Sequence, residues 1–163
     1  MLIDELKNIA RNNGIVGAGG AGFPAYAKMT EKADTVILNC VECEPLLKLH
    51  RQLLATHTEE IIQMLDEVRE SFGAKEAVIG IKSEYVTTIK AIEEVIGDFP
   101  NVRICALKAA YPMGDEVVLI YEATGRVIKP GGLPIDENVV VYNVETMYNL
   151  YSCLLYTSPS PRD

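Results

Sequence analysis

A glycine-rich stretch near the start of the chain limits the folds that this sequence can adopt. Residues 17–24 read Gly-Ala-Gly-Gly-Ala-Gly-Phe-Pro, so four glycines fall within six positions. Glycine permits positive φ and close approach of the backbone to a ligand, and successive N–H groups can then form an anion-binding nest. A tight structural turn is the alternative interpretation. The stretch predicts a backbone cradle for a phosphate-bearing cofactor.

The stretch does not fit the two standard phosphate-binding fingerprints. A Walker A loop needs Lys and then Ser or Thr directly after its last glycine, whereas Phe23 and Pro24 follow Gly22. Gly17, Gly19 and Gly22 have the G-x-G-x-x-G spacing, but the apolar residues before them have the spacing of a helix and not of a strand. Support for a ligand site must therefore come from the rest of the chain.

After the glycine stretch, short apolar runs alternate with segments of helical spacing. The predicted strands are 35–38, 77–81, 102–107 and 139–142, and the predicted helices are 46–72, 86–96 and 115–124. This order predicts one α/β domain over residues 1–150, with a Rossmann-like, mostly parallel sheet flanked by helices and preceded by an N-terminal helix and the glycine loop. No repeat or low-complexity linker divides it.

Polar residues follow three of the predicted strands. They are Asn39, Glu42 and Glu44 after the first strand, Tyr111, Gly114, Asp115 and Glu116 after the third, and Asn143 and Thr146 after the fourth. Open α/β sheets bind ligands at the carboxyl ends of their strands. We therefore expect these residues and the glycine loop to share one crevice suited to a nucleotide-like ligand.

Five motifs carry a family resemblance across roughly residues 1–150. In chain order they are GAGGAGFP, NxxExEP, YPxGDE, GRVIKPGGLP and NVET. The set is similar to the flavin-binding domain of the NADH-oxidising subunit of respiratory complex I, and looks closer to the C subunit of Rnf-type complexes and the related cobalamin reductases of propanediol utilisation. The resemblance implies noncovalent FMN, hydride exchange with NADH or NAD, and single-electron transfer to iron–sulfur clusters.

The resemblance also implies roles for individual residues. The implied FMN-binding positions are Gly17, Ala18, Gly19, Gly20, Gly22, Lys28, Asn39, Glu42, Gly114, Asp115, Glu116, Asn143 and Thr146. Phe23, Glu44 and Tyr111 would line the NADH side, and a core position is the alternative for Phe23. Hydride transfer would be the chemistry of the cofactor, so no catalytic side chain is expected.

Several of these positions also have a simpler interpretation. Lys28 is consistent with a solvated surface residue, Asn39 with a strand end that bonds its own backbone, and residues 115–116 with the first turn of a helix. Val41 and Asp115 stand where the family pattern has Asp and Glu. These departures keep open a noncatalytic scaffold that docks subunits of an electron-transfer complex. A regulatory module that prefers NAD or ATP is a third possibility.

Composition excludes several classes of function. The net charge of −8 would repel nucleic acid. No apolar run approaches the roughly 20 residues needed to cross a bilayer, and the amino terminus does not resemble a signal peptide. We expect a cytoplasmic protein that reaches a membrane or a microcompartment only through its partners. Those partners would be subunits of an electron-transfer complex, or a ferredoxin or corrinoid acceptor.

The cysteines and histidines do not predict a metal site. Cys40 and Cys43 form a C-x-x-C, but an iron–sulfur site needs four thiolates, so ordinary reduced thiols are favoured. The 4Fe–4S clusters of the family are expected only in a missing C-terminal region or in partners. His50 and His57 are predicted on one long helix and facing solvent.

The end of the sequence breaks the α/β pattern. Residues 153–163 read CLLYTSPSPRD and look like translated adapter sequence at the end of a truncated gene prediction. We expect residues 151–163 to be a non-native tail. The natural protein would then continue past about Tyr151 into the ubiquitin-like and cluster-binding modules typical of relatives.

Overall fold

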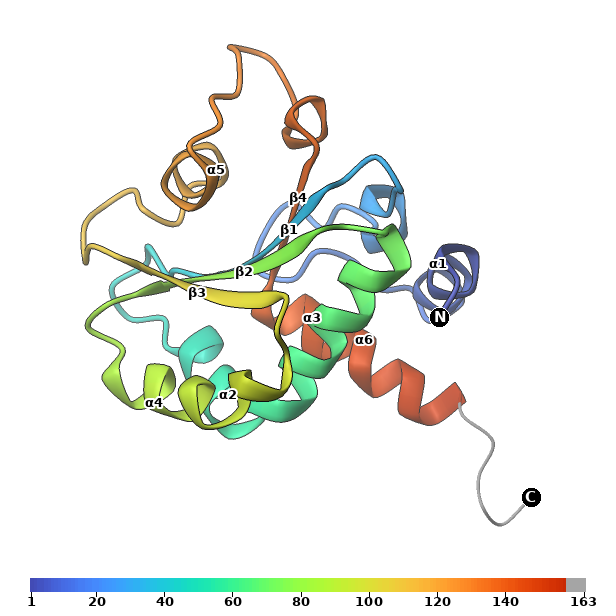
Figure 1. Cartoon of the computed structure of the whole chain (residues 1–163), viewed down its shortest axis with the longest axis horizontal. Helices are drawn as coiled ribbons and strands as arrows, with labels where there is room; N and C mark the ends of the chain where they lie inside the picture. Colours follow the sequence, from blue (N-terminus) through green and yellow to red (C-terminus); the bar gives the residue numbers. More distant parts are fainter. Residues whose placement is uncertain (158–163) are drawn as a thin grey trace.

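The sheet of the computed structural model, which describes residues 1–157, has four parallel strands in the order β3-β2-β1-β4 (Figure 1). The strands are β1 (Thr35–Cys40), β2 (Glu76–Lys82), β3 (Val102–Leu107) and β4 (Val139–Asn143). β1 lies between β2 and β4 and is buried along almost its whole length. Such continuously apolar, β-branched runs are typical of parallel strands covered on both faces. The predicted Rossmann-like sheet is therefore confirmed.

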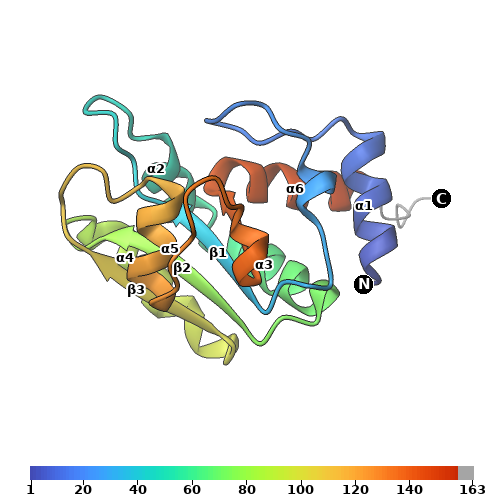
Figure 2. The ribbon, with the colours of Figure 1, turned by 90° about the horizontal axis from the view of Figure 1, so that it is seen from above.

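Helices cover the two faces of the sheet unequally. The helices are α1 (Ile3–Asn12), α2 (Leu49–Thr56), α3 (Thr58–Phe72), α4 (Val86–Val95), α5 (Glu116–Thr124) and α6 (Val144–Thr157), with short 3₁₀ helices η1 (Ala25–Lys28), η2 (Ile96–Asp98) and η3 (Pro134–Glu137). α2, α3, α4 and α6 lie on one side of the sheet (Figure 1). α5 lies across the other side, as the view turned by 90° also shows (Figure 2).

The strands supply two hydrophobic clusters, one for each face. Ile37 and Val78 belong to the cluster under α5, whereas Leu38 and Ile79 belong to the larger cluster that includes α3 and α6. Successive side chains of a strand point to opposite faces, so each apolar run serves both clusters. The sheet is thereby held rigidly between two layers, and its carboxyl edge is left for the loops.

The prediction of one helix over residues 46–72 is wrong, because the chain bends at His57. His57 has φ −127° and ψ 43°, so α2 ends at Thr56 and α3 begins at Thr58. The Thr58 hydroxyl donates a 2.7 Å hydrogen bond to the carbonyl oxygen of Leu54. Threonine hydroxyls that bond back in this way compete with the backbone ladder and bend helices. The loop before α2 is also longer than predicted, since α2 begins only at Leu49.

The predicted domain end at residue 150 falls inside α6. Leu150 is fully buried, and Cys153 and Leu154 pack against the larger core cluster. Residues 158–163, the last part of the predicted tail, lie outside the described residues, and the tail's non-native origin stays a prediction. Within residues 1–157, no helix has both the length and the apolar character that crossing a membrane requires.

Candidate functional site

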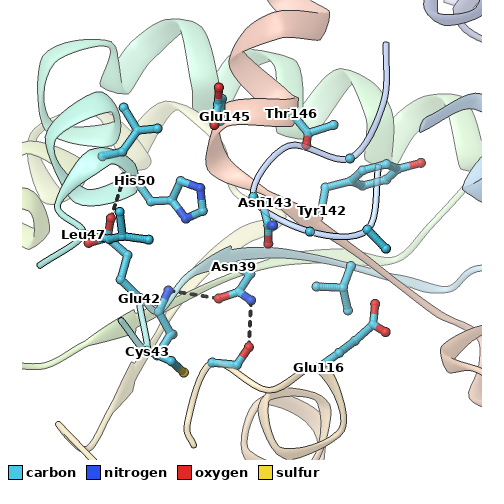
Figure 3. A pocket seen from close by; sticks show the side chains of 18 of the residues that line it. Asn39, Glu42, Cys43, Leu47, His50, Glu116, Tyr142, Asn143, Glu145 and Thr146 are labelled. Carbon is cyan, nitrogen blue, oxygen red and sulfur yellow. Dashed lines mark hydrogen bonds between the residues drawn. The ribbon is translucent and has the colours of Figure 1, made fainter. Parts of the chain in front are cut away.

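A cleft of about 670 Å³ lies at the carboxyl ends of β1 and β4 (Figure 3). Its volume is typical of cofactor sites, and its place in the sheet is the usual ligand position of open α/β folds. From the glycine loop and the strand ends, it is lined by Gly17, Gly19, Gly20, Phe23, Asn39, Glu42, Glu44 and Asn143. Lys28, Gly114, Glu116 and Thr146 also line it. Most of the predicted positions are thus brought together.

Four predicted residues do not line the cleft. Tyr111 is 84% exposed, and Gly22, with a φ of +68°, follows the turn formed by residues 18–21. Ala18 takes part only through its backbone. The Asp115 carboxylate is turned back onto α5, where Oδ1 accepts hydrogen bonds from the N–H groups of residues 117 and 118. Asp115 is the N-cap of α5, which is the simpler of its two interpretations.

The glycine loop is held in place by the last strand and the helix after it. Ala18 N–H donates a 2.9 Å hydrogen bond to Thr146 Oγ1, and Asn143 Nδ2 donates a 2.8 Å bond to the Ala18 carbonyl oxygen. Gly17 N–H donates to the Phe23 carbonyl oxygen at 2.8 Å and closes the loop on itself. The loop therefore presents a fixed wall of backbone to the cleft.

Gly19 is the point at which this wall needs glycine most. Its φ is +75°, in the left-handed region, and a Cβ built there would lie 3.4 Å from the imidazole of His50 and 3.5 Å from Asn143 Nδ2. A side chain at this position would be strained and would enter the cleft. The geometry fits a ligand that packs directly against the backbone, as a planar flavin ring would.

Asn39 joins two loops at the floor of the cleft. Its Nδ2 donates a 3.1 Å hydrogen bond to the Gly114 carbonyl oxygen, and its Oδ1 accepts a 2.9 Å bond from Val41 N–H. A Cβ at Gly114 would overlap the Val41 carbonyl oxygen and lie 2.9 Å from Cys43 Sγ. The segment after β1 and the segment before α5 therefore touch through their backbones. Asn39 therefore makes the local backbone hydrogen bond expected of a residue at a strand end. It also connects the two segments that form the floor of the cleft.

Glu42 is a buried carboxylate with one oxygen left over. Its side chain is 3% exposed; Oε1 accepts a 2.9 Å hydrogen bond from His50 N–H in the first turn of α2. Among residues 1–157, Oε2 has no hydrogen-bond partner, and it forms a longer ion pair with Arg51, whose Nε is 3.7 Å away. The Arg51 guanidinium in turn stacks over the Tyr85 ring at 4.6 Å. A buried oxygen atom without a hydrogen bond raises the free energy of the folded state, and a hydrogen bond from a ligand would remove that cost.

Lys28 is not the free surface lysine of its simpler interpretation. Its Nζ lies 3.4 Å from Glu116 Oε1 and 3.4 Å from the Val141 carbonyl oxygen. η1 and α5 are therefore linked across the cleft by a partly exposed ion pair. The core position considered for Phe23 is wrong, because its side chain is 50% exposed beside the glycine loop.

His50 is the main site residue that the sequence interpretation missed. It was expected to face solvent, but it is half-buried and lines the cleft. Burial lowers the pKa of its imidazole, while the charges of Glu42 and Glu145 act to raise it. The error follows from the missed bend at residue 57, because α2 has a helical phase of its own. Thr56 and Thr58, which flank the bend, are the local sequence signal that could have indicated it.

Cys40 is a buried thiol at the end of β1. Burial, the largest influence, and the nearby charge of Glu42 raise the pKa of the Cys40 thiol, so Cys40 is held in the neutral form. Within residues 1–157, no three His, Cys, Asp or Glu side chains are gathered as ligands of a metal ion would be.

The parallel sheet and its glycine-walled cleft define a cofactor-binding α/β domain. The chain belongs to the family of the Nuo51 FMN-binding domain, whose model matches residues 10–152. This match confirms the family predicted from the five sequence motifs. The family name includes FMN, and the backbone wall at Gly19 and the Glu42 oxygen without a hydrogen bond in the described residues are compatible with that cofactor.

Individual relatives agree with this membership. Over 145 residues the chain is 39% identical to cobalamin reductase PduS of Citrobacter freundii, covering 89% of this chain and 32% of that protein. Over 160 residues it is 34% identical to the C subunit of the Na+-translocating ferredoxin:NAD+ oxidoreductase complex of Acetobacterium woodii, covering 96% of this chain and 36% of that relative. The chain thus spans about a third of the length of these curated relatives.

The fold also has solved counterparts. A chain of an NAD+-reducing NiFe-hydrogenase in the air-oxidized state superposes with a TM-score of 0.78 at 25% sequence identity. The match covers 92% of this chain and 30% of the hydrogenase chain.

Proposed function

We propose that this chain is the FMN-binding part of a flavin-dependent oxidoreductase. The whole protein would take hydride from NADH, or return it to NAD, and pass single electrons to iron–sulfur clusters on other domains or partner subunits. The acceptor would be a ferredoxin or a corrinoid. We further propose a cytoplasmic protein whose partners bring it to a membrane or a microcompartment. Membership of the FMN-binding family supports the proposal that this chain binds FMN.

The observation that carries the proposal is the backbone wall of the cleft. Gly17, Gly19 and Gly20 offer a surface without side chains on which the flavin ring would pack. Lys28 would offset negative charge, and Glu42 Oε2 would accept a hydrogen bond from the ligand. When bound, FMN would supply the exchange between two-electron hydride chemistry and single-electron transfer.

The protein's part in this chemistry is to bind and orient. The loop is tied to Asn143 and Thr146, and the floor is tied through Asn39, so the walls are set before a ligand arrives. Fixed geometry of this kind lowers the entropic cost of bringing two reactants together. Phe23 and Glu44 are exposed members of the lining, where NADH would make contact.

The test is a titration of FMN into the purified chain, followed by flavin fluorescence, with circular dichroism as the measure of folding. Saturable quenching is expected for the unmodified chain and is expected to be absent for Gly19→Asp. Gly14→Asp is the matched control, because Gly14 also has positive φ (+64°), lies outside the cleft, and has no atom within 4 Å of a built Cβ. Gly14→Asp adds the same charge and similar backbone strain, but its side chain does not block the glycine wall of the cleft.

Each outcome selects a function. A folded chain that does not bind FMN would favour the noncatalytic scaffold. A chain that binds NAD or ATP in preference to FMN, in direct competition, would favour the regulatory module. Normal FMN binding by Gly19→Asp would show that the glycine loop is not the cradle.

A further inference from the structure

The lining of the cleft carries more carboxylates than cations. Its acidic residues are Glu42, Glu44, Glu116 and Glu145. Among the described lining residues, the cation-forming side chains are Lys28, already 3.4 Å from Glu116, and His50. A phosphate group brings a charge of about −1.5 to −2 at neutral pH. Arg51 and Lys28 already face Glu42 and Glu116, so a further positive charge in the cleft would favour binding of the phosphate.

His50 is placed to supply that charge. It is the second residue of α2, and its Cε1 and Nε2 would both lie 3.4 Å from a Cβ built at Gly19. The edge of the ring therefore faces the glycine loop, and Figure 3 shows the ring in the cleft between Leu47 and Asn143. A flavin ring that packs on the loop would contact this imidazole, and the phosphate of the same FMN, which would enter the same cleft, would act on it through its charge.

Charged groups approach His50 from several elements. Glu42 lies in the segment after β1, Glu145 in the first turn of α6, and Arg51 beside it on α2. The other charged groups of the lining are Glu44, Lys28 and Glu116. Burial lowers the pKa of His50 and the two carboxylates Glu42 and Glu145 oppose this, so the ring of the free protein is neutral at neutral pH. An added anion would favour the charged form.

We propose that His50 couples the binding of a phosphate-bearing flavin to the uptake of one proton from solvent. The neutral imidazole gains the proton as the anion enters, and the imidazolium then offsets the carboxylates around it. This inference rests on the proposed function, because FMN must occupy the cleft.

The direction of the pH dependence follows from linkage. Anion binding raises the pKa of His50 above its value in the free protein. Affinity for FMN therefore increases as pH falls through the pKa of the complex, and it levels off below the pKa of the free protein. Above both values the ring is neutral in the free and bound states, and His50 contributes no pH dependence.

The experiment measures the FMN dissociation constant by fluorescence between pH 5.5 and 8 for the unmodified chain, His50→Gln and His57→Gln. We expect a His50-dependent gain of up to about tenfold per pH unit, the limit for one linked proton. His57→Gln should keep it, because His57 packs 4.5 Å from the Tyr148 ring and does not line the cleft. The phosphate's own ionisation, near pH 6, also occurs without His50, so the effect of His50 is the difference in pH dependence between the unmodified chain and His50→Gln.

Two further measurements test whether the phosphate is the group responsible and whether one proton is taken up on binding. Riboflavin lacks the phosphate, so its affinity should have the same pH slope with and without His50. Calorimetry of the unmodified chain in buffers of different ionisation enthalpy should detect proton uptake with FMN. Three results would overturn the inference while FMN binding itself stands. They are an equal pH slope of FMN affinity in the unmodified chain and His50→Gln, a His50-dependent pH slope with riboflavin, and no proton uptake on FMN binding. Absence of FMN binding at every pH would overturn the proposed function first.

Discussion

Asn143 Nδ2 donates a 2.8 Å hydrogen bond to the carbonyl oxygen of Ala18, which joins the end of the last strand to a loop 125 residues earlier. The N–H of the same alanine donates to Thr146 Oγ1 at 2.9 Å. Both polar backbone groups of Ala18 are thus bonded to the β4–α6 junction. The shape of the cradle depends on this junction as much as on the glycines themselves.

Thr146→Val should loosen the glycine loop. Valine has the shape of threonine but cannot accept the Ala18 N–H bond, so we expect a loss of about 1–3 kcal/mol in the free energy of unfolding. FMN affinity should fall with it. Chemical denaturation and FMN titration measure the two effects. Thr146→Ser, which keeps the hydroxyl, is the control, and unchanged FMN affinity in the valine variant would contradict the role of this bond.

Gly114→Ala should disrupt the floor of the cleft. The new methyl group would overlap the Val41 carbonyl oxygen, which belongs to backbone and cannot move aside cheaply. We expect destabilisation of about 1–3 kcal/mol, as for overpacked cores, together with weaker FMN binding. Gly97→Ala is the matched control, because a Cβ there meets no atom within 4 Å. Equal melting temperatures for the two variants would refute the close contact.

Asp115→Ala tests whether this residue caps a helix or contacts the flavin. Loss of the two hydrogen bonds to the start of α5 should cost about 1 kcal/mol, whereas Asp115→Asn should keep most of the cap. FMN affinity should hardly change in either variant, since Asp115 does not line the cleft. A large loss of affinity at unchanged stability would instead restore the ligand contact implied by the family resemblance.

The ion pair of Asp34 and Arg126 should make stability depend on acid pH. Burial acts to raise the pKa of Asp34, but hydrogen bonds from Arg126, 2.6 Å away, and Thr35 outweigh it and leave the pKa below its ordinary value. The stabilisation is therefore present above the ordinary pKa of about 4 and disappears as pH falls through the lowered value. Urea denaturation should show that Asp34→Asn is less stable than the unmodified chain at pH 6, and that this difference shrinks toward pH 2.

Arg126→Gln is the partner variant for that measurement. It should remove most of the same pH dependence. The double variant should lose less stability than the sum of the two single variants, because both single variants break the same ion pair. Independent, additive effects of the two substitutions would show that the ion pair does not couple them.

Local sequence patterns were sufficient for the sheet and for the position of the cleft. The run 102–107 forms β3 within the predicted bounds, and the other three strands extend theirs by only one or two residues. β-branched apolar runs favour buried parallel strands wherever they occur, so neighbouring residues carry this information. The polar residues after β1 and β4 then had to meet at one edge, because parallel strands end on the same side.

Side-chain partners could not be predicted in this way, because they depend on packing between distant segments. Lys28 lies beside Glu116, 88 positions away, and Ala18 is bonded to Asn143 and Thr146. His50 faces the glycine loop from α2, which is separated from α3 by a bend at His57, where threonine hydroxyls compete with the helix ladder. The sequence alone determined the family, the parallel sheet and the position of the glycine loop. Asp115 is a local case, since its carboxylate caps the helix that begins one residue later. The tertiary structure decided which side chains enter the cleft, because each choice balances contacts between elements that are neighbours only in the folded chain.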